Sequence, residues 1–472
     1  MQTKFPQYVE QIIDIPDDPS IALASRDQIS IFHIIGISAS MLSYQIAYSV
    51  EFAITTPLMK SLNFSPLSIG LLWLAGPLSG FFIQPLFGGY SDTTRLKLGR
   101  RRPFILTGLI LTTICMIIIY FLKSLISNLK FPYQCIIMFI VLMCTNVSIN
   151  VIQVPARAIV GDLVPFHQQA LANIIGSTLL SIAAVLANLL GGISYFVKLS
   201  WITLNEKQFT IIAGTILIII FGTITLLVGT EEQLLEIPAR ENPFVEIYRA
   251  FRSMPKPIYT IGIIYALSWV AYFPFQTITT DFFGSSIFNG SQNSSNTEDI
   301  DLYNKGVSFG MLVISISNFL VLIYGLIHEK LRKVVGLRWS YFISQAITAL
   351  SLSMCFFVKN KWVLMGTLSF LGVSSLIFNA IPFEIVARTV ALEQMGTYMG
   401  VLNSFAVFGQ IFANFAMVSG VGSMRKEPGD AIGAGCIFAI IAAIYSLFLN
   451  EPADPTDVLK SSITPYICDP IR

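Results

Sequence analysis

Residues 73–107 read WLAGPLSGFFIQPLFGGYSDTTRLKLGRRRPFILT, a long apolar stretch that ends in a short basic turn. The turn gathers Arg95, Lys97, Arg100, Arg101 and Arg102 near a single acid, Asp92. The apolar part is long enough to cross a bilayer as a helix, and short loops rich in Arg and Lys stay in the cytoplasm. This stretch therefore predicts both a membrane span and its direction.

The composition of the whole chain agrees with a membrane protein. The mean hydropathy is +0.70 and only 12% of the 472 residues are charged, whereas charged residues make up about a quarter of soluble domains. Basic residues are confined to short turns and the net charge is +2, so no nucleic-acid partner is expected. We find no metal-ligand spacing and no catalytic constellation, and we predict neither a cofactor nor an enzyme.

Apolar runs of about membrane length occur twelve times, in two sets of six. We predict an all-α membrane protein with a cytoplasmic segment 1–30, a six-helix bundle 31–230, a cytoplasmic linker 231–256, a second six-helix bundle 257–449 and a cytoplasmic tail 450–472. The linker carries four basic residues, which place it inside the cell. The loop 284–305 should then be external, and it holds two glycosylation sequons, at Asn289 and Asn293.

The basic turn recurs in the second half of the chain. In the first copy, Gly88 is followed at fixed offsets by Asp92, Gly99 and Arg101; in the second, Gly325 is followed at the same offsets by Glu329, Gly336 and Arg338. Parallel repeats of six helices are typical of major facilitator transporters. We interpret the turns as structural latches at the cytoplasmic ends of the helices, formed by Asp92, Arg101, Arg102, Glu329, Arg338 and Arg388.

Several motifs together resemble the sucrose and glucoside proton symporters of the major facilitator superfamily. They are WLAGPLSGFFIQPLFGGYSD with GRRRPF, VPARAIVGDL in the fourth span, WVAYFPFQTITTDFFG in the seventh and GVLNSFAVFGQ in the eleventh. The resemblance implies a twelve-helix transporter for a neutral sugar. Plant members typically carry His after the first helix and Gln within it, where this chain has Pro66 and Glu51. We therefore expect a closer relation to the fungal and animal branches.

Ionisable residues inside the apolar spans fall on every third helix: Glu51, Arg157, Asp162, Asp281, Glu384 and Arg388. A charge at mid-membrane costs about 2.5 to 3.5 kcal/mol, so such residues persist when paired, hydrated or functional. Coupling a proton to a neutral sugar needs a carboxylate that binds and releases the proton. Glu51 is our first choice and Asp162 the second, and Arg157 offers a fixed fork of donors to a sugar or a carboxylate.

Each of these residues also has a structural interpretation. The alternatives for Glu51 are a helix-packing hydrogen bond and an external rim site. The alternative for Asp162 is a cytoplasmic gate that pairs with Arg388 or with the basic turn. Asp281 is either a substrate ligand or an outer-gate acid near the external surface. Glu384 follows Pro382 as Arg157 follows Pro155, and we expect it to neutralise Arg157 across the bundle.

Sugar recognition needs aromatic faces for the C–H surface of the ring and amides or hydroxyls for its oxygens. The candidate substrate ligands are Arg157, Gln45, Gln153, Trp269, Tyr272, Gln276, Asp281, Glu384, Asn403 and Gln410. Amides also join membrane helices, and Trp is common at membrane interfaces, so each of these residues has a structural alternative.

We therefore predict a monomeric proton-coupled symporter of sucrose, maltose or a related glucoside, working by alternating access. The plasma membrane is favoured over the vacuolar membrane. The alternatives are an uncoupled facilitator or organellar exporter of the same sugars, or a transporter-like sugar sensor. The short linker and tail argue against a sensor.

Overall fold

The computed structural model describes residues 28–94, 96–165, 168–193, 206–230, 242–390, 392–425 and 427–451. Within these ranges the regular elements are all helical. Twelve helical segments are long and apolar enough to cross a membrane. The predicted fold class is confirmed.

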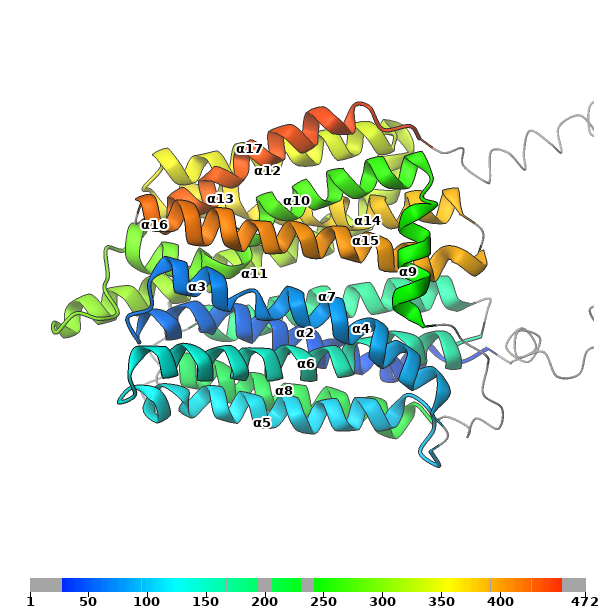
Figure 1. Ribbon diagram of the computed structural model, residues 1–472, viewed down its shortest axis with the longest axis horizontal. Coiled ribbons are helices and arrows are strands. Elements are labelled where there is room, and N and C mark those ends of the chain that lie inside the picture. Colours follow the sequence, from blue (N-terminus) through cyan, green and yellow to red (C-terminus); the bar gives the residue numbers. More distant parts are fainter. Residues whose placement is uncertain are drawn as a thin grey trace, which may run out of the picture.

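Figure 1 shows the helices in two groups that lie side by side with their long axes nearly parallel. The first bundle contains α2 (Ile31–Lys60), α3 (Pro66–Leu72), α4 (Ala75–Thr93), α5 (Arg102–Ile126), α6 (Phe131–Leu163), α7 (Gln169–Gly192) and α8 (Glu206–Val228). The second bundle contains α10 (Lys256–Asp281), η3 (Phe282–Ile287), α11 (Thr297–Val335), α12 (Leu337–Phe357), α13 (Lys361–Ser369), α14 (Leu371–Thr389), α15 (Leu392–Phe412), η4 (Ala413–Val421), α16 (Gly422–Arg425) and α17 (Pro428–Ser446).

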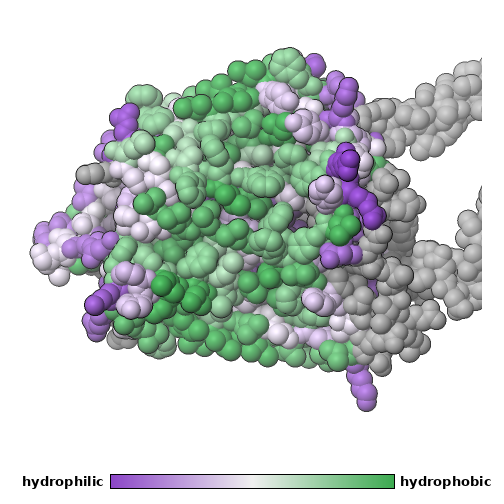
Figure 2. All heavy atoms as spheres, in the orientation of Figure 1, coloured by the Kyte–Doolittle hydropathy of each residue, from purple (hydrophilic) through white to green (hydrophobic). Residues whose placement is uncertain are grey.

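Several pairs of elements bring the bundles together: α2 contacts α10, α3 contacts η4, α4 contacts α15, and α7 contacts α11. The last pair packs backbone to backbone, because a Cβ on Gly192 would lie 3.0 Å from the backbone nitrogen of Leu312. Figure 2 shows a broad hydrophobic girdle between two hydrophilic ends. The girdle has the form expected of a lipid-facing surface.

Capping residues explain where several helices begin. Ser30, Ser65, Asn242, Asn296 and Asn360 each accept a backbone N–H at the first turn of a helix, which satisfies donors that have no partner within the helix. Asn296 starts α11 nine residues before the predicted span at 306, so part of the expected external loop is helical. The linker likewise contains a helix, α9 (Pro243–Arg252).

The repeated basic turns share one backbone feature. Gly99 has φ 96° and Gly336 has φ 86°, and they are the glycines with positive φ in the described ranges. This left-handed region is disfavoured for residues with a Cβ, so glycine is the residue that fits both turns. The spacing that identified the repeat in the sequence therefore corresponds to a repeated conformation.

Candidate functional site

A polar zipper joins α2 to α6 within the first bundle. Its rungs are the hydrogen-bonded pairs Tyr44–Arg157 (3.1 Å), Tyr48–Gln153 (3.3 Å) and Glu51–Asn146 (2.6 Å). The residue numbers rise on α2 while they fall on α6, as antiparallel helices require. Spacings of three, four and seven place each set on one helix face.

Glu51 forms the most buried rung. Its side chain is 2% exposed, and Oε1 accepts a hydrogen bond from Nδ2 of Asn146. Oε2 is buried and has no hydrogen-bond partner in the described ranges. Asn146, 4% exposed, also donates to the carbonyl of Leu142. The carboxyl group thus keeps one oxygen available for a proton without giving up its amide partner.

Arg157 lies at the other end of the zipper. Its Nε donates to the hydroxyl of Tyr44, and its guanidinium carbon is 5.9 Å from the centre of the Tyr44 ring. Tyr44 is 1% exposed, yet Arg157 is exposed. The guanidinium of Arg157 is therefore the accessible end of the zipper.

Amide side chains extend the zipper towards the second bundle. Nε2 of Gln84 in α4 donates to Asn150 (2.8 Å) and to Gln153 (3.3 Å). Asn403 of α15 donates to Oε1 of Gln84 at 3.5 Å. The residues Asn146, Asn150, Gln153 and Arg157 form a single stripe on α6. Two of the predicted ligands, Gln153 and Asn403, are therefore joined through Gln84, which the sequence analysis missed.

An aromatic cluster joins α10 to α14 in the second bundle. The Trp269 ring packs against Tyr265, Tyr272 and Phe378, with ring centroids 5.7 to 6.3 Å apart. Tyr265 also donates to Oδ1 of Asn379 at 3.0 Å. Trp269 and Tyr272, both predicted ligands, thus belong to one aromatic cluster that has polar groups at its edge.

An acid and a lysine join the two bundles at one end. Asp281 on α10, 1% exposed, lies 3.3 Å from Nζ of Lys60 on α2. Its Oδ1 accepts from the Tyr303 hydroxyl at 2.8 Å, and Nζ of Lys207 lies 5.4 Å from the centre of the Tyr303 ring. Nearby, Thr56 of α2 donates to the carbonyl of Thr277. Asp281 and Lys60 thus form an ion pair between the bundles, and the role of Asp281 as an outer-gate acid stays a prediction.

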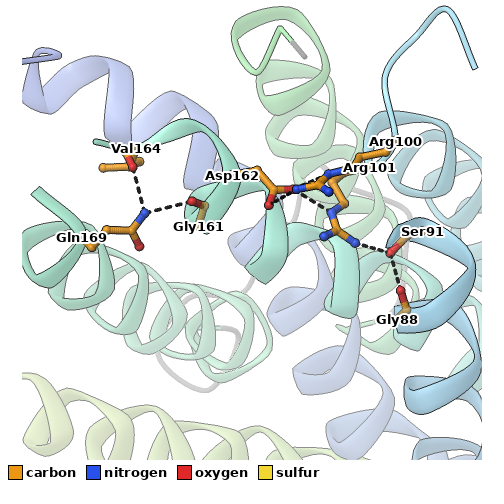
Figure 3. A network of polar contacts seen from close by, with 8 residues as sticks. All are labelled: Gly88, Ser91, Arg100, Arg101, Gly161, Asp162, Val164 and Gln169. Atoms are coloured by element: carbon orange, nitrogen blue, oxygen red, sulfur yellow. Dashed lines mark hydrogen bonds and ion pairs between the residues drawn. The ribbon is translucent and has the colours of Figure 1, made fainter. Parts of the chain in front are cut away.

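At the opposite end, Asp162 is held by the first basic turn (Figure 3). Its carboxylate accepts from Arg100 (2.5 Å) and from Arg101 (2.8 Å). Arg101 is 5% exposed and also donates to Ser91, which in turn donates to the carbonyl of Gly88. Of the two partners expected for a gating Asp162, the structure has the basic turn.

In the second bundle, Glu384 pairs with two arginines, as Asp162 does in the first bundle. It lies 2.7 Å from Nη1 of Arg332 and 2.5 Å from Nη2 of Arg388. The expectation that Glu384 neutralises Arg157 is therefore wrong for this structure. The reason is that α11 supplies a nearer cation: Arg332 is 8% exposed and also pairs with Glu329. The sequence analysis missed Arg332, although it follows Glu329 by one helical turn in the second basic segment.

The remaining predicted latch residues have separate partners. Arg102 donates to the carbonyl of Leu226 on α8. Arg338 accompanies Arg101 in the repeat but does not bind a membrane carboxylate. Its backbone N–H binds Glu451 and its guanidinium reaches the carbonyl of Leu447 at 3.4 Å. The side chain of Asp92 lies outside the described residues.

Three predicted substrate ligands have no hydrogen bond to the amide network of Gln84, Asn150, Gln153 and Asn403 in the described ranges. Gln45, Gln276 and Gln410 are half-buried, and Gln276 lies one helical turn beyond Tyr272. The sequon residues Asn289 and Asn293 are both exposed in the segment before α11. The described residues contain no group of three His, Cys, Asp or Glu side chains placed to hold a metal ion.

Two bundles of membrane helices, with a polar zipper inside the first bundle and an ion pair between the bundles at one end, have the architecture of a membrane transporter. The sequence profile of the Major Facilitator Superfamily matches residues 35–414. The chain belongs to this superfamily. The expectations of a transporter rather than an enzyme, and of this fold, are thereby confirmed.

Relatives support the same assignment. The chain is 26% identical to "Sucrose transport protein SUT1" of Oryza sativa subsp. japonica, over 86% of this chain and 85% of that protein. It is 25% identical to "Sucrose transport protein SUC4" of Arabidopsis thaliana, over 88% and 91% of the two chains. Both relatives are plant proteins, so they do not support the expected closeness to the fungal and animal branches.

Solved structures share the fold at low sequence identity. A mutant of the nucleoside transporter NupG superposes with a TM-score of 0.62 at 15% identity, covering 88% of this chain and 98% of that one. A bacterial homologue of the human lysosomal transporter Spinster, in an inward-facing and unoccupied conformation, gives a TM-score of 0.62 at 14% identity, covering 90% and 98%.

Proposed function

We propose that the protein is a proton-coupled symporter of a neutral sugar, with sucrose as the first candidate and maltose or a related glucoside next. The observation that carries this proposal is the polar zipper, which has a buried carboxyl group at one end and an accessible guanidinium at the other. The names of the plant relatives support sucrose as the substrate.

The sugar would bind between the zipper and the aromatic cluster. Arg157, Gln84 and Gln153 supply hydrogen-bond donors and acceptors for hydroxyl groups. Trp269 and Tyr265 supply flat apolar faces for the C–H surface of the ring. A few placed polar groups against aromatic walls are the usual composition of a small-molecule site.

The proton would bind Glu51. Its free Oε2 accepts the proton, and the Asn146 amide continues to donate to Oε1. Neutralising this carboxyl group removes a charge from the buried junction of α2 and α6, where a bare charge would oppose closure in a low-dielectric setting. Sugar binding and protonation would then favour the same closed intermediate, which is the linkage that symport requires.

The described conformation fits one stage of alternating access. Asp281 and Lys60 close one end, whereas Arg157 remains accessible. We assign the closed end to the outside, with both termini in the cytoplasm, because the basic turns lie at the opposite end. The exposed sequon residues Asn289 and Asn293 then lie outside, where they are available for glycosylation. The plasma membrane is the proposed location, and one chain suffices for transport.

Purified protein in liposomes tests the proposal. Counterflow of labelled sucrose and maltose identifies the substrate, and a pH dye trapped inside the vesicles reports proton movement. We expect added sucrose to acidify the lumen. Sucrose counterflow without any pH change would contradict coupling and leave a facilitator, and the absence of counterflow with either sugar would contradict the substrate class.

A further inference from the structure

The helix α9 has two faces with different chemistry. Val245, Tyr248, Arg249 and Arg252 are exposed and follow the spacing of one helix face. Val245 is 45% and Tyr248 is 67% exposed. The opposite face contains Ala250, which is 6% exposed. An aromatic residue and arginines on one exposed face of a short helix are typical of the membrane interface.

The inner face of α9 is attached to both bundles. The Phe244 ring packs against Phe82 of α4 in the first bundle, with centroids 6.4 Å apart. The Phe251 ring packs against Phe405 of α15 in the second bundle at 5.6 Å. Glu246 accepts a hydrogen bond from Thr397 of α15. Figure 1 shows α9 lying across the ends of the long helices, roughly perpendicular to them.

The position of α9 brings its exposed face to the edge of the bilayer. Phe82, against which Phe244 packs, is 49% exposed on the apolar side of α4, so that end of α9 adjoins the hydrophobic girdle. The one carboxylate of α9, Glu246, points instead to Thr397. The exposed face of α9 therefore combines two arginines with an aromatic ring.

We propose that α9 is an interfacial strap that binds anionic phospholipid headgroups of the cytoplasmic leaflet through Arg249 and Arg252, with Tyr248 and Val245 inserted beside them. This proposal adopts the orientation given above but does not depend on the sugar or on proton coupling. Each basic residue near an anionic surface strengthens the attraction about fivefold. Because the strap contacts both bundles, headgroup binding would couple lipid charge to their relative movement.

Hydrogen exchange of the full-length protein in nanodiscs tests the strap. Nanodiscs of phosphatidylcholine alone are compared with nanodiscs that also contain phosphatidylserine. We expect exchange of the α9 amides to be slower by about fivefold or more in the anionic discs. High salt should remove most of the difference, because the attraction is electrostatic.

Variants separate this effect from a general influence of charge. Arg249→Gln with Arg252→Gln should abolish the slowing, and Arg252→Lys, which keeps the charge, should retain it. Lys330→Gln removes an exposed charge near the second basic turn and should leave α9 unaffected. Equal exchange in both kinds of nanodisc, or full slowing in the double Gln variant, would overturn the proposal. Because the readout is exchange, loss of transport in a variant does not obscure the result.

Discussion

The exchange of Glu51 for Gln separates the chemistry of the zipper from its structure. Gln retains an oxygen that can accept from Asn146, so the folding cost should stay within about 1 kcal/mol. The variant has no carboxyl group to carry a proton. We therefore expect a folded protein that still exchanges sugar across the membrane but cannot accumulate it.

The size of the lost accumulation follows from the driving force. One proton moving through a membrane potential of about 100 mV supplies about 2.3 kcal/mol, which supports about 50-fold accumulation of a neutral sugar. Wild-type protein in liposomes with an imposed potassium diffusion potential should approach this value. Glu51→Gln should equilibrate the sugar without concentrating it.

A swapped pair provides the matched control. The 2.6 Å contact between Glu51 and Asn146 joins a carboxylate to an amide, and Glu51→Gln with Asn146→Asp exchanges the two groups at equal total side-chain length. The carboxylate then lies at the same junction of α2 and α6, and accumulation should return at least in part. Accumulation by the single Glu51→Gln variant equal to that of wild type would refute the reasoning.

Three further predictions concern other parts of the site. Arg157→Lys keeps the charge but loses the planar fork that binds Tyr44, and sucrose counterflow should fall by about tenfold. Lys60→Met leaves the buried Asp281 without its cation and should favour the externally open state by about 1 to 2 kcal/mol. A cysteine introduced at Thr56 should then be labelled faster from outside, and unchanged labelling would contradict this gate. Asp162→Asn weakens the contacts with Arg100 and Arg101 and should lower the free energy of unfolding by about 1 to 3 kcal/mol in thermal melts, whereas Glu329→Gln, at a side chain 61% exposed, should change it by less than about 0.5 kcal/mol.

The fold was largely predictable because hydrophobic length and basic turns carry strong signals. The twelve apolar runs and the repeated turn both follow from local composition. Two features of the fold that the sequence did not indicate depend on single residues that cap the N-terminus of a helix. Asn296 extends α11 into the expected loop, and Asn242 starts a helix within the linker.

The candidate site was predictable only in part. Glu51, Arg157 and Gln153 were noticed because charged and amide groups are rare in membrane spans. Their partners Tyr44 and Asn146 gave a weaker signal. Tyr44 lies two helical turns from Glu51 on α2, and Asn146 lies two helical turns from Gln153 on α6. The pairing of Glu384 was not predictable. Its partner Arg332 lies on a different helix, α11, and only the packing of the helices brings Arg332, rather than the expected Arg157, close to Glu384.

The central claim, that a proton on the α2–α6 zipper moves with the sugar, is tested most directly by electrical recording. Liposomes containing the protein are adsorbed to a solid-supported membrane and exposed to a sucrose jump without a pH gradient. The account predicts an inward transient current for the wild type and none for Glu51→Gln, although that variant still exchanges labelled sucrose. An electrically silent wild type, or an undiminished current in the variant, would contradict it.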